Sequence, residues 1–158
     1  MSQATVKTPL SGWGRYPVVD AVLARPERYL ELQQWAAQAS LARGMGRAYG
    51  DAAISASGTT VLTSRLNRFL AFDAETGVLR AEAGVTLDEI LQVVMPQGWF
   101  LPVTPGTRYV TLGGAVAADV HGKNHHHVGS FSAFVTGIEL FTSTGQFHCS
   151  AIENAEIF

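Results

Sequence analysis

The pattern of apolar and polar positions predicts short strands that alternate with two or three helices. Pro26 suits the first turn of a helix, and residues 27–39 follow with good helix formers and no internal Gly or Pro. Apolar side chains recur at helical spacing, so this helix is expected to cover a sheet with one face. The apolar stripe consists of Tyr29, Leu32, Ala36 and Ala39.

The second helix is the most clearly marked element of the chain. Thr86 and Glu89 have the spacing of a capping box at its start, and Pro96 and Gly98 mark its exit. Acidic residues in the first turn, here Asp88 and Glu89, favour the positive end of the helix dipole and need no catalytic role. The residues at helical spacing are Leu87, Ile90, Leu91 and Val94.

Shorter apolar runs bounded by turn residues predict the strands. Thr76 and Gly77 separate two such runs and residues 143–145 separate another two, so each pair is expected to form a hairpin. Asn154 is expected to cap a further helix. The predicted strands are residues 41–43, 59–64, 69–73, 78–83, 99–103, 134–141 and 146–150. This order of elements predicts an α+β fold of two closely packed lobes.

Composition favours an ordered protein with a proper core. The chain has 158 residues, 47% of them apolar and 15% charged, which argues against disorder. Its net charge of −2 argues against nucleic acid and anionic membrane surfaces as partners. The single Cys149 cannot form an internal disulfide, and no apolar run has the length of a membrane span or signal peptide. The chain is therefore expected to be cytoplasmic. Its three tryptophans are expected to be packing residues rather than a base-stacking surface, since no basic stripe accompanies them.

The domain organisation is expected to be simple. Residues 1–9 are expected to form an N-terminal tail and residues 10–158 the domain itself, with no internal repeat or linker. The predicted last helix has barely begun at Phe158, which predicts that the chain is part of a longer protein.

A glycine-rich segment, residues 42–51, is the first candidate for chemistry. Its glycines space a loop whose backbone N–H groups can form a nest for an anion, and two arginines add positive charge. The spacing matches neither a P-loop nor the Gly-x-Gly-x-x-Gly dinucleotide fingerprint. A phosphate-binding loop and a plain tight turn are therefore both open. The residues concerned are Arg43, Gly44, Gly46, Arg47 and Gly50.

A second glycine-rich segment follows the predicted helix start at Thr111. Gly113 and Gly114 lie in the first turn, where backbone without side chains can approach a phosphate and direct free N–H groups at it. Close packing of the helix against a neighbour gives the same pattern. Two such segments in one chain suggest a ligand with an extended phosphate, held from two sides.

A dense group of histidines follows this helix. Imidazole is a common ligand of zinc and copper, but no cysteine pair or obvious carboxylate completes a set, and Gly122 and Asn124 weaken any helical geometry. No native metal site is therefore predicted. The histidines are His121, His125, His126 and His127.

Several of these segments, in this order, resemble the flavin-binding domain of FAD-linked oxidases of the vanillyl-alcohol oxidase and p-cresol methylhydroxylase type. Within that superfamily the resemblance is strongest to enzymes that oxidise polyprenyl-phosphate sugars. It implies a two-lobed α+β FAD-binding domain, truncated at its C-terminal end and without the substrate cap. The matching motifs are residues 10–15, 42–51, 105–108, 111–115 and 121–126.

The resemblance also implies a role for each motif. Residues 42–51 would wrap the FAD pyrophosphate, whereas Lys123 and Tyr49 would lie on the substrate side. Ala48 stands where the nearest relatives have serine. The residues implied at the pyrophosphate are Arg43, Gly44, Met45, Gly46, Arg47, Ala48, Tyr49 and Gly50. Those implied along the rest of the cofactor are Gly106, Thr111, Leu112, Gly113, Gly114, Ala118 and His121.

The same resemblance implies noncovalent FAD. Arg47 occupies the place where some members attach flavin to a histidine, and members that share the segment around His121 hold FAD without a covalent link. The implied reaction is oxidation of a hydroxyl of a sugar or polyprenyl-phosphate sugar, with hydride transfer to flavin N5. This chain alone is expected to be inactive, because the substrate cap would be missing.

Two alternative functions stay open. The first is an alditol or sugar-lactone oxidase that uses oxygen, and the second is a non-catalytic FAD- or nucleotide-binding module. The expected partners are FAD, a small-molecule or lipid-linked sugar, and the remaining C-terminal domain of the same protein. A lipid-linked substrate would place the protein at the periphery of a membrane.

Overall fold

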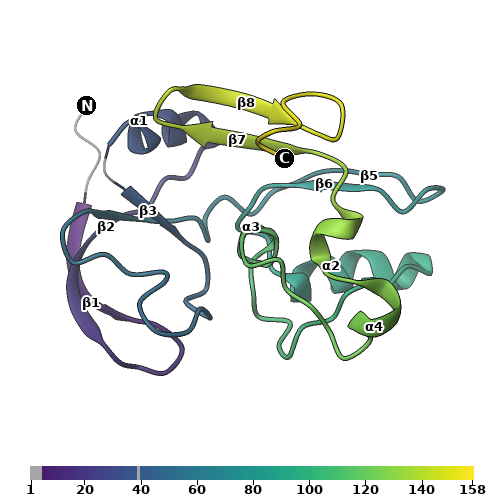
Figure 1. Ribbon diagram of the computed structural model, residues 1–158, viewed down its shortest axis with the longest axis horizontal. Helices are drawn as coiled ribbons and strands as arrows, with labels where there is room; N and C mark the ends of the chain where they lie inside the picture. The colour runs from purple at the N-terminus through teal and green to yellow at the C-terminus, as the bar shows by residue number, and fades with distance from the viewer. Residues whose placement is uncertain (1–4, 39) are drawn as a thin grey trace.

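The computed structural model of the protein describes residues 5–38 and 40–158 and has an α+β fold of two lobes (Figure 1). The first lobe is built on a four-stranded sheet in the order β1-β2-β4-β3. β1 and β2 are antiparallel, whereas β2 and β3 both run parallel to β4. The strands are β1 (Thr5–Ser11), β2 (Val18–Ala24), β3 (Ser40–Arg43) and β4 (Thr59–Leu62).

A short helix, α1 (Leu32–Ala36), packs on this sheet after the 3-10 turn η1 (Tyr29–Glu31). Trp35 is 7% exposed and packs with Ala24 of β2 and Val61 of β4, which forms the core of the first lobe. The helix is shorter than the expected residues 27–39. It ends where the hydroxyl of Ser40 donates to the Trp35 carbonyl at 2.8 Å and turns the chain into β3.

The second lobe combines a hairpin with short helices around a larger apolar core. β5 and β6 are antiparallel, and Thr86 caps α2 through a complete capping box with Glu89. The elements are β5 (Phe69–Phe72), β6 (Leu79–Ala81), α2 (Leu87–Val94), η2 (Met95–Gln97), α3 (Leu112–Ala117), α4 (His125–Val128) and η3 (Phe131–Phe134). The core consists of Val85, Leu87, Ile90, Val94, Val103, Ala115 and Phe131. Within the described residues, no helix is long and apolar enough to cross a membrane.

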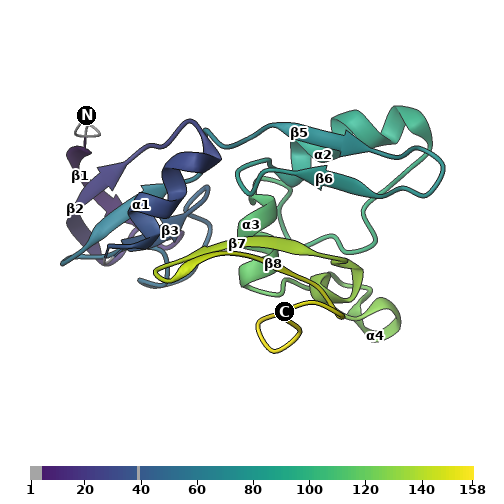
Figure 2. The ribbon, with the colours of Figure 1, turned by 90° about the horizontal axis from the view of Figure 1, so that it is seen from above.

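A second hairpin, formed by β7 and β8, extends across both lobes (Figures 1 and 2). Toward the first lobe, the side-chain amide of Gln33 in α1 donates to the carbonyl of Thr142 at 3.1 Å. Toward the second lobe, Glu139 forms an ion pair with Arg80 of β6. The hairpin therefore fastens the two lobes to each other. Its strands are β7 (Ile138–Thr142) and β8 (Gly145–Cys149).

The two-lobed α+β fold and both hairpins are confirmed, but the strand predicted at residues 99–103 is wrong. Gly98 adopts a left-handed conformation with φ of 84°, and Pro102 has no N–H to give to a ladder. Trp99 and Val103 instead pack individually on the core of the second lobe. The chain here is a connection between α2 and α3.

Three expectations near the termini also need correction. Residues 5–9, expected in a tail, pair with β2 as part of β1, and residues 1–4 and Ala39 lie outside the described residues. The strand expected from residue 134 begins at Ile138, and Phe134 is instead the last residue of η3. Asn154 has φ of 48° rather than the extended conformation of an N-cap, and its side-chain amide donates to the carbonyl of His148.

Candidate cofactor-binding site

The first glycine segment forms the start of the loop between β3 and β4. Within the described residues, no backbone N–H from residues 45–50 donates to a protein carbonyl. Gly46 and Gly50 have φ values of 65° and 58°, the left-handed conformation that glycine adopts without strain and that occurs in anion-binding nests. The loop therefore offers unpaired N–H donors of the kind that a phosphate accepts.

The side chain of Arg43 stabilises this loop through two hydrogen bonds to backbone carbonyls. Its Nη1 donates to the carbonyl of Ala53 at 2.9 Å, and its Nη2 donates to the carbonyl of Ser11 at 2.8 Å. A Cβ on Gly46 would lie 2.3 Å from that Nη2, so a side chain at residue 46 would displace the guanidinium. Burial lowers the pKa of Arg43, although a guanidinium stays charged at neutral pH. Arg43 therefore shapes the loop as well as adding charge to it.

The two glycine segments lie side by side. A Cβ on Gly44 would lie 2.2 Å from Oγ1 of Thr111, so the end of β3 and the start of α3 are in direct contact. Nε of Arg47 donates to the carbonyl of Tyr109 at 3.3 Å and provides a second link. The structure thus brings together the two segments that a ligand held from two sides requires.

The start of α3 does not offer free N–H groups, which corrects the expectation for this segment. The N–H of Gly113 donates to the carbonyl of Ala83 at 2.8 Å, that of Gly114 donates to Oγ1 of Thr111 at 3.2 Å, and that of Leu112 is also bound within the protein. A Cβ on Gly113 would lie 2.8 Å from the Cβ of Ala83, so close packing explains this glycine. Gly114 is exposed and leaves its backbone surface open.

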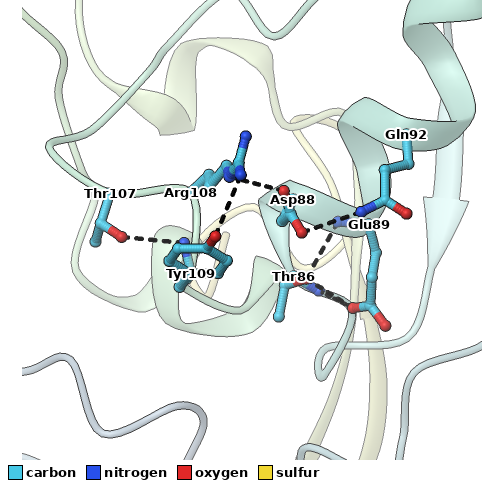
Figure 3. A network of polar contacts seen from close by, with 7 residues as sticks. All are labelled: Thr86, Asp88, Glu89, Gln92, Thr107, Arg108 and Tyr109. Carbon is cyan, nitrogen blue, oxygen red and sulfur yellow. Dashed lines mark hydrogen bonds and ion pairs between the residues drawn. The ribbon is translucent and has the colours of Figure 1, made fainter.

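A polar network holds the segment that carries Tyr109 (Figure 3). Nε of Arg108 lies 2.8 Å from Oδ1 of Asp88, and its Nη2 donates to the Tyr109 hydroxyl at 3.2 Å. The hydrogen bond to Tyr109 and then the charge of Asp88 raise the pKa of Arg108. The N–H of Tyr109 donates to Oγ1 of Thr107 at 3.2 Å. Asp88, at the start of α2, therefore helps to position the segment whose Tyr109 carbonyl accepts the hydrogen bond from Arg47.

The segment around His121 contacts residues 102–104, at the opposite end of the connection between α2 and α3 from Tyr109. A Cβ on Gly122 would lie 2.8 Å from the carbonyl oxygen of Thr104, and the side-chain amide of Asn124 donates to the carbonyl of Pro102 at 3.0 Å. Residues 102–111 therefore run from the His121 segment to the first glycine loop. These contacts place the predicted site residues of the second lobe along one continuous stretch of backbone.

Asp119 fixes the chain just before His121. Its carboxylate accepts the N–H of Ser132 at 2.9 Å and the hydroxyl of Ser130 at 2.7 Å. These hydrogen bonds, the one from the Ser132 backbone first, lower the pKa of Asp119, and the nearby His121 adds to the lowering. Asp119 has φ of 39°, so this network holds a non-glycine residue in a left-handed conformation.

The histidines stack rather than converge. The ring centroids of His121 and His125 are 5.0 Å apart, and those of His125 and His126 are 3.8 Å apart, with the rings tilted in both pairs. Nδ1 of His125 lies 3.0 Å from the carbonyl oxygen of Gly122. Across the residues that the structure describes, no three His, Cys, Asp or Glu side chains gather as metal ligands would.

The other predicted site residues lie at the surface. Tyr49, in the first lobe, is 81% exposed, and Met45 is 44% exposed. Lys123, in the second lobe, is also exposed. Tyr49 and Lys123 thus belong to different lobes, and both are open to a further part of the protein or to a ligand. Exposed positions along the connection and α3 include Gly106 and Ala118.

The residues present fit a dinucleotide with a diphosphate group, since unpaired N–H donors, arginines and a second glycine segment lie together. The FAD binding domain family matches residues 21–150. The chain belongs to this family. Most of the described chain is therefore an FAD-binding domain.

Individual relatives are similar to this chain over different shares of its length. The chain is 42% identical over 149 residues to decaprenylphosphoryl-beta-D-ribose oxidase of Mycolicibacterium smegmatis, covering 90% of this chain and 32% of that protein. It is 28% identical over 97 residues to D-lactate dehydrogenase of Anaerostipes hadrus, covering 61% of this chain and 20% of that protein. The solved structure of alkyldihydroxyacetonephosphate synthase shares the fold with a TM-score of 0.73 at 20% identity, covering 89% of this chain and 28% of that chain. The chain thus spans about a third or less of the length of these relatives.

Sequence reasoning missed one contact of the first glycine loop. Trp13, expected to be a packing residue, is 53% exposed in the turn between β1 and β2. The backbone N–H of Trp13 donates to the carbonyl of Ala48 at 2.9 Å, and the guanidinium of Arg47 lies 4.7 Å from the centroid of the Trp13 ring. The two glycines that flank Trp13 indicate a turn, but spacing alone does not show that this turn touches residues 45–50.

Proposed function

We propose that this chain binds FAD noncovalently and serves an oxidoreductase that oxidises a hydroxyl of a sugar carried on a polyprenyl phosphate. The proposal rests chiefly on the loop of residues 45–50. Its backbone N–H groups are unpaired, and it includes the positively charged Arg47. FAD, when bound, accepts a hydride from the substrate carbon at flavin N5. The substrate class is supported by the 42% identity to a relative named as a decaprenylphosphoryl-beta-D-ribose oxidase.

The residues of this chain bind and orient the cofactor. In this proposal the N–H groups of residues 45–50 donate to the diphosphate, which is charge-assisted hydrogen bonding in a preformed loop. The contact between Gly44 and Thr111 brings the second segment close enough to line the same ligand. Tyr49 and Lys123 face the substrate. The residues proposed to line the rest of the cofactor are Gly106, Leu112, Gly114, Ala118 and His121.

Noncovalent attachment is supported by the side chains available. Arg47 lies over Trp13 and donates to Tyr109, and a guanidinium does not form the histidyl link to flavin. Acid or heat denaturation should release a yellow flavin with the mass of FAD. Flavin that stays on the denatured chain would contradict noncovalent binding.

We also propose that the chain is the N-terminal FAD-binding part of a longer enzyme, since its relatives are about three times its length. Because β1 belongs to the sheet, this part includes residues 5–9. A separate part would bring the substrate pocket, since such pockets form preferentially between domains. We place the enzyme in the cytoplasm, at the membrane periphery when its substrate is lipid-linked.

The substrate class is tested by anaerobic mixing of the FAD-loaded full-length enzyme with candidate substrates. A polyprenyl-phosphoribose analogue should bleach the flavin absorbance, whereas alditols and sugar lactones should not. Bleaching by an alditol alone would favour the alternative of an alditol oxidase. Bleaching by none of them in an enzyme that binds FAD would favour a non-catalytic module.

A further inference from the structure

The turn between β1 and β2, residues 12–15, lies outside residues 21–150 that the family matches, yet it contacts the first glycine loop. The N–H of Arg15 donates to the carbonyl of Gly12 at 3.1 Å and closes the turn. A Cβ on Gly12 would lie 2.3 Å from the carbonyl oxygen of Gly50 and 2.8 Å from that of Ala48. The turn is therefore pressed against the backbone of the loop.

Two further contacts join the turn region to the arginines of the loop. Nη2 of Arg43 donates to the carbonyl of Ser11, and the guanidinium of Arg47 lies over the ring of Trp13. These contacts use carbonyl groups and an aromatic face, so they leave the N–H groups of residues 45–50 unpaired. The turn thus supports the loop on one side and leaves its donors free.

A cavity of about 310 Å³ lies between the turn and the loop. Its lining includes three arginine residues, and no carboxylate within the described residues forms an ion pair with any of them. The arginines that do form ion pairs lie elsewhere in the fold. Three like charges without a counter-ion around one cavity are typical of an anion-binding site. The three arginines are Arg15, Arg43 and Arg47.

Arg15 has an unusual backbone conformation. Its φ is 60°, a left-handed conformation that costs a side-chain-bearing residue free energy and that glycine adopts freely. The neighbouring Gly14 shows that small residues occur in this turn, and its Cβ position is open. A strained residue held beside a ligand loop indicates a functional use of its side chain.

We propose that residues 12–15 form a second wall of the diphosphate site, in which Arg15 binds the diphosphate of FAD and Trp13 positions Arg47 toward the same group. The proposal rests on FAD binding by this chain. Arg15 acts as a ligand-binding residue, since it is one of the residues that line the cavity. Trp13 acts through Arg47 and is a positioning residue.

The test compares Arg15→Gly, Arg15→Lys and the control Arg25→Gln, whose exposed arginine follows β2 at the end away from the turn. Fluorescence titration should show FAD affinity reduced roughly tenfold in Arg15→Gly, because a charge-assisted contact is lost. Arg15→Lys should retain most of the affinity, and Arg25→Gln all of it. The apo Arg15→Gly variant should have a Tm equal to that of the wild type or roughly 2–4 °C higher, since strain is relieved.

A second measurement uses inorganic diphosphate alone, read as a shift in Tm. Diphosphate should raise the Tm of the wild type and of Arg15→Lys, and less that of Arg15→Gly. The FAD-affinity loss should shrink at high salt, because a partly exposed charge is screened. Unchanged FAD affinity in Arg15→Gly, or an equal diphosphate shift in all variants, would overturn the proposal. A wild type that responds to diphosphate but not to FAD would instead contradict the proposed function.

Discussion

The backbone N–H of Gly113 donates to the carbonyl oxygen of Ala83 at 2.8 Å, and a Cβ on Gly113 would lie 2.8 Å from the Cβ of Ala83. This contact decides between the two explanations of the second glycine pair. Gly113 allows α3 to pack on the residues after β6, whereas the exposed Gly114 leaves a surface for a ligand. The two neighbouring glycines should therefore respond differently to substitution.

Gly113→Ala should lower the free energy of unfolding by about 1–2 kcal/mol. The added methyl group meets the Cβ and the carbonyl oxygen of Ala83, and overpacking of this kind outweighs the helix propensity gained. Urea unfolding followed by circular dichroism measures the change. Gly114→Ala is the matched control, because its Cβ would meet only Oγ1 of Thr111, at 3.0 Å. Equal stability of both variants would show that packing does not explain Gly113.

Gly114→Val should instead reduce FAD affinity by roughly tenfold or more while the fold is kept. The branched side chain would cover backbone that is exposed at the start of α3, where we propose that the cofactor lies. Equilibrium titration with FAD measures the loss, and circular dichroism of the same sample checks folding. Normal FAD binding by a folded Gly114→Val protein would remove Gly114 from the proposed contacts.

Much of the fold was predictable because its signals are local. The capping box of Thr86 and Glu89, the two hairpin turns and the helix start at Thr111 depend on residues within a few positions of one another. The strand predicted at residues 99–103 failed because an apolar run can equally pack as an irregular connection. Sequence pattern does not distinguish these two outcomes.

The site was predictable in its segments but not in its tertiary contacts. The first glycine loop was proposed from its glycines, yet the contact of Trp13 with Arg47 joins residues 34 positions apart and has no local signal. The N–H groups at the start of α3 were expected to be free. Whether they are depends on the carbonyls of Ala83 and Val85, which lie in the connection between β6 and α2, far from α3 in the sequence.

Arg43→Lys should destabilise the protein by about 1–2 kcal/mol and weaken FAD binding. The guanidinium donates to the carbonyls of Ala53 and Ser11 with different nitrogens, and a single ammonium cannot reproduce both contacts. Urea unfolding and FAD titration measure the two effects. Arg25→Lys serves as the control at an exposed position. If Arg43→Lys matched the wild type in both measurements, Arg43 would not be the support of the loop.

Glu89→Gln should reduce stability at neutral pH and remove part of its pH dependence. Burial, the largest single influence, raises the pKa of Glu89, but hydrogen bonds from Thr86 and Asn67 outweigh it and the pKa is lowered. A lowered pKa means that the carboxylate stabilises the fold fully above its unfolded pKa of about 4.3 and loses this effect as pH falls through the folded value. Glutamine keeps the capping geometry, so the cost at pH 7 should be about 0.5–1 kcal/mol.

The check is urea unfolding of wild type and Glu89→Gln at pH 7 and near pH 3. The difference in the free energy of unfolding should shrink as the pH falls from 7 toward 3, because protonation of Glu89 removes the charge that distinguishes it from glutamine. A difference that stays constant between the two pH values would mean that the charge of Glu89 contributes nothing to the cap.

The FAD-loaded chain of 158 residues should not oxidise sugars by itself. Removal of a hydroxyl proton requires a base within hydrogen-bonding reach of the substrate, held in a site that excludes water. Tyr49 and Lys123, the residues proposed on the substrate side, are both exposed, and they come from different lobes. Anaerobic mixing with polyols and a polyprenyl-phosphoribose analogue, followed by flavin absorbance, tests this expectation. Bleaching at an enzymatic rate would show that these residues already contain the catalytic groups, and Tyr49→Phe and Lys123→Met would then identify which side chain serves as the base.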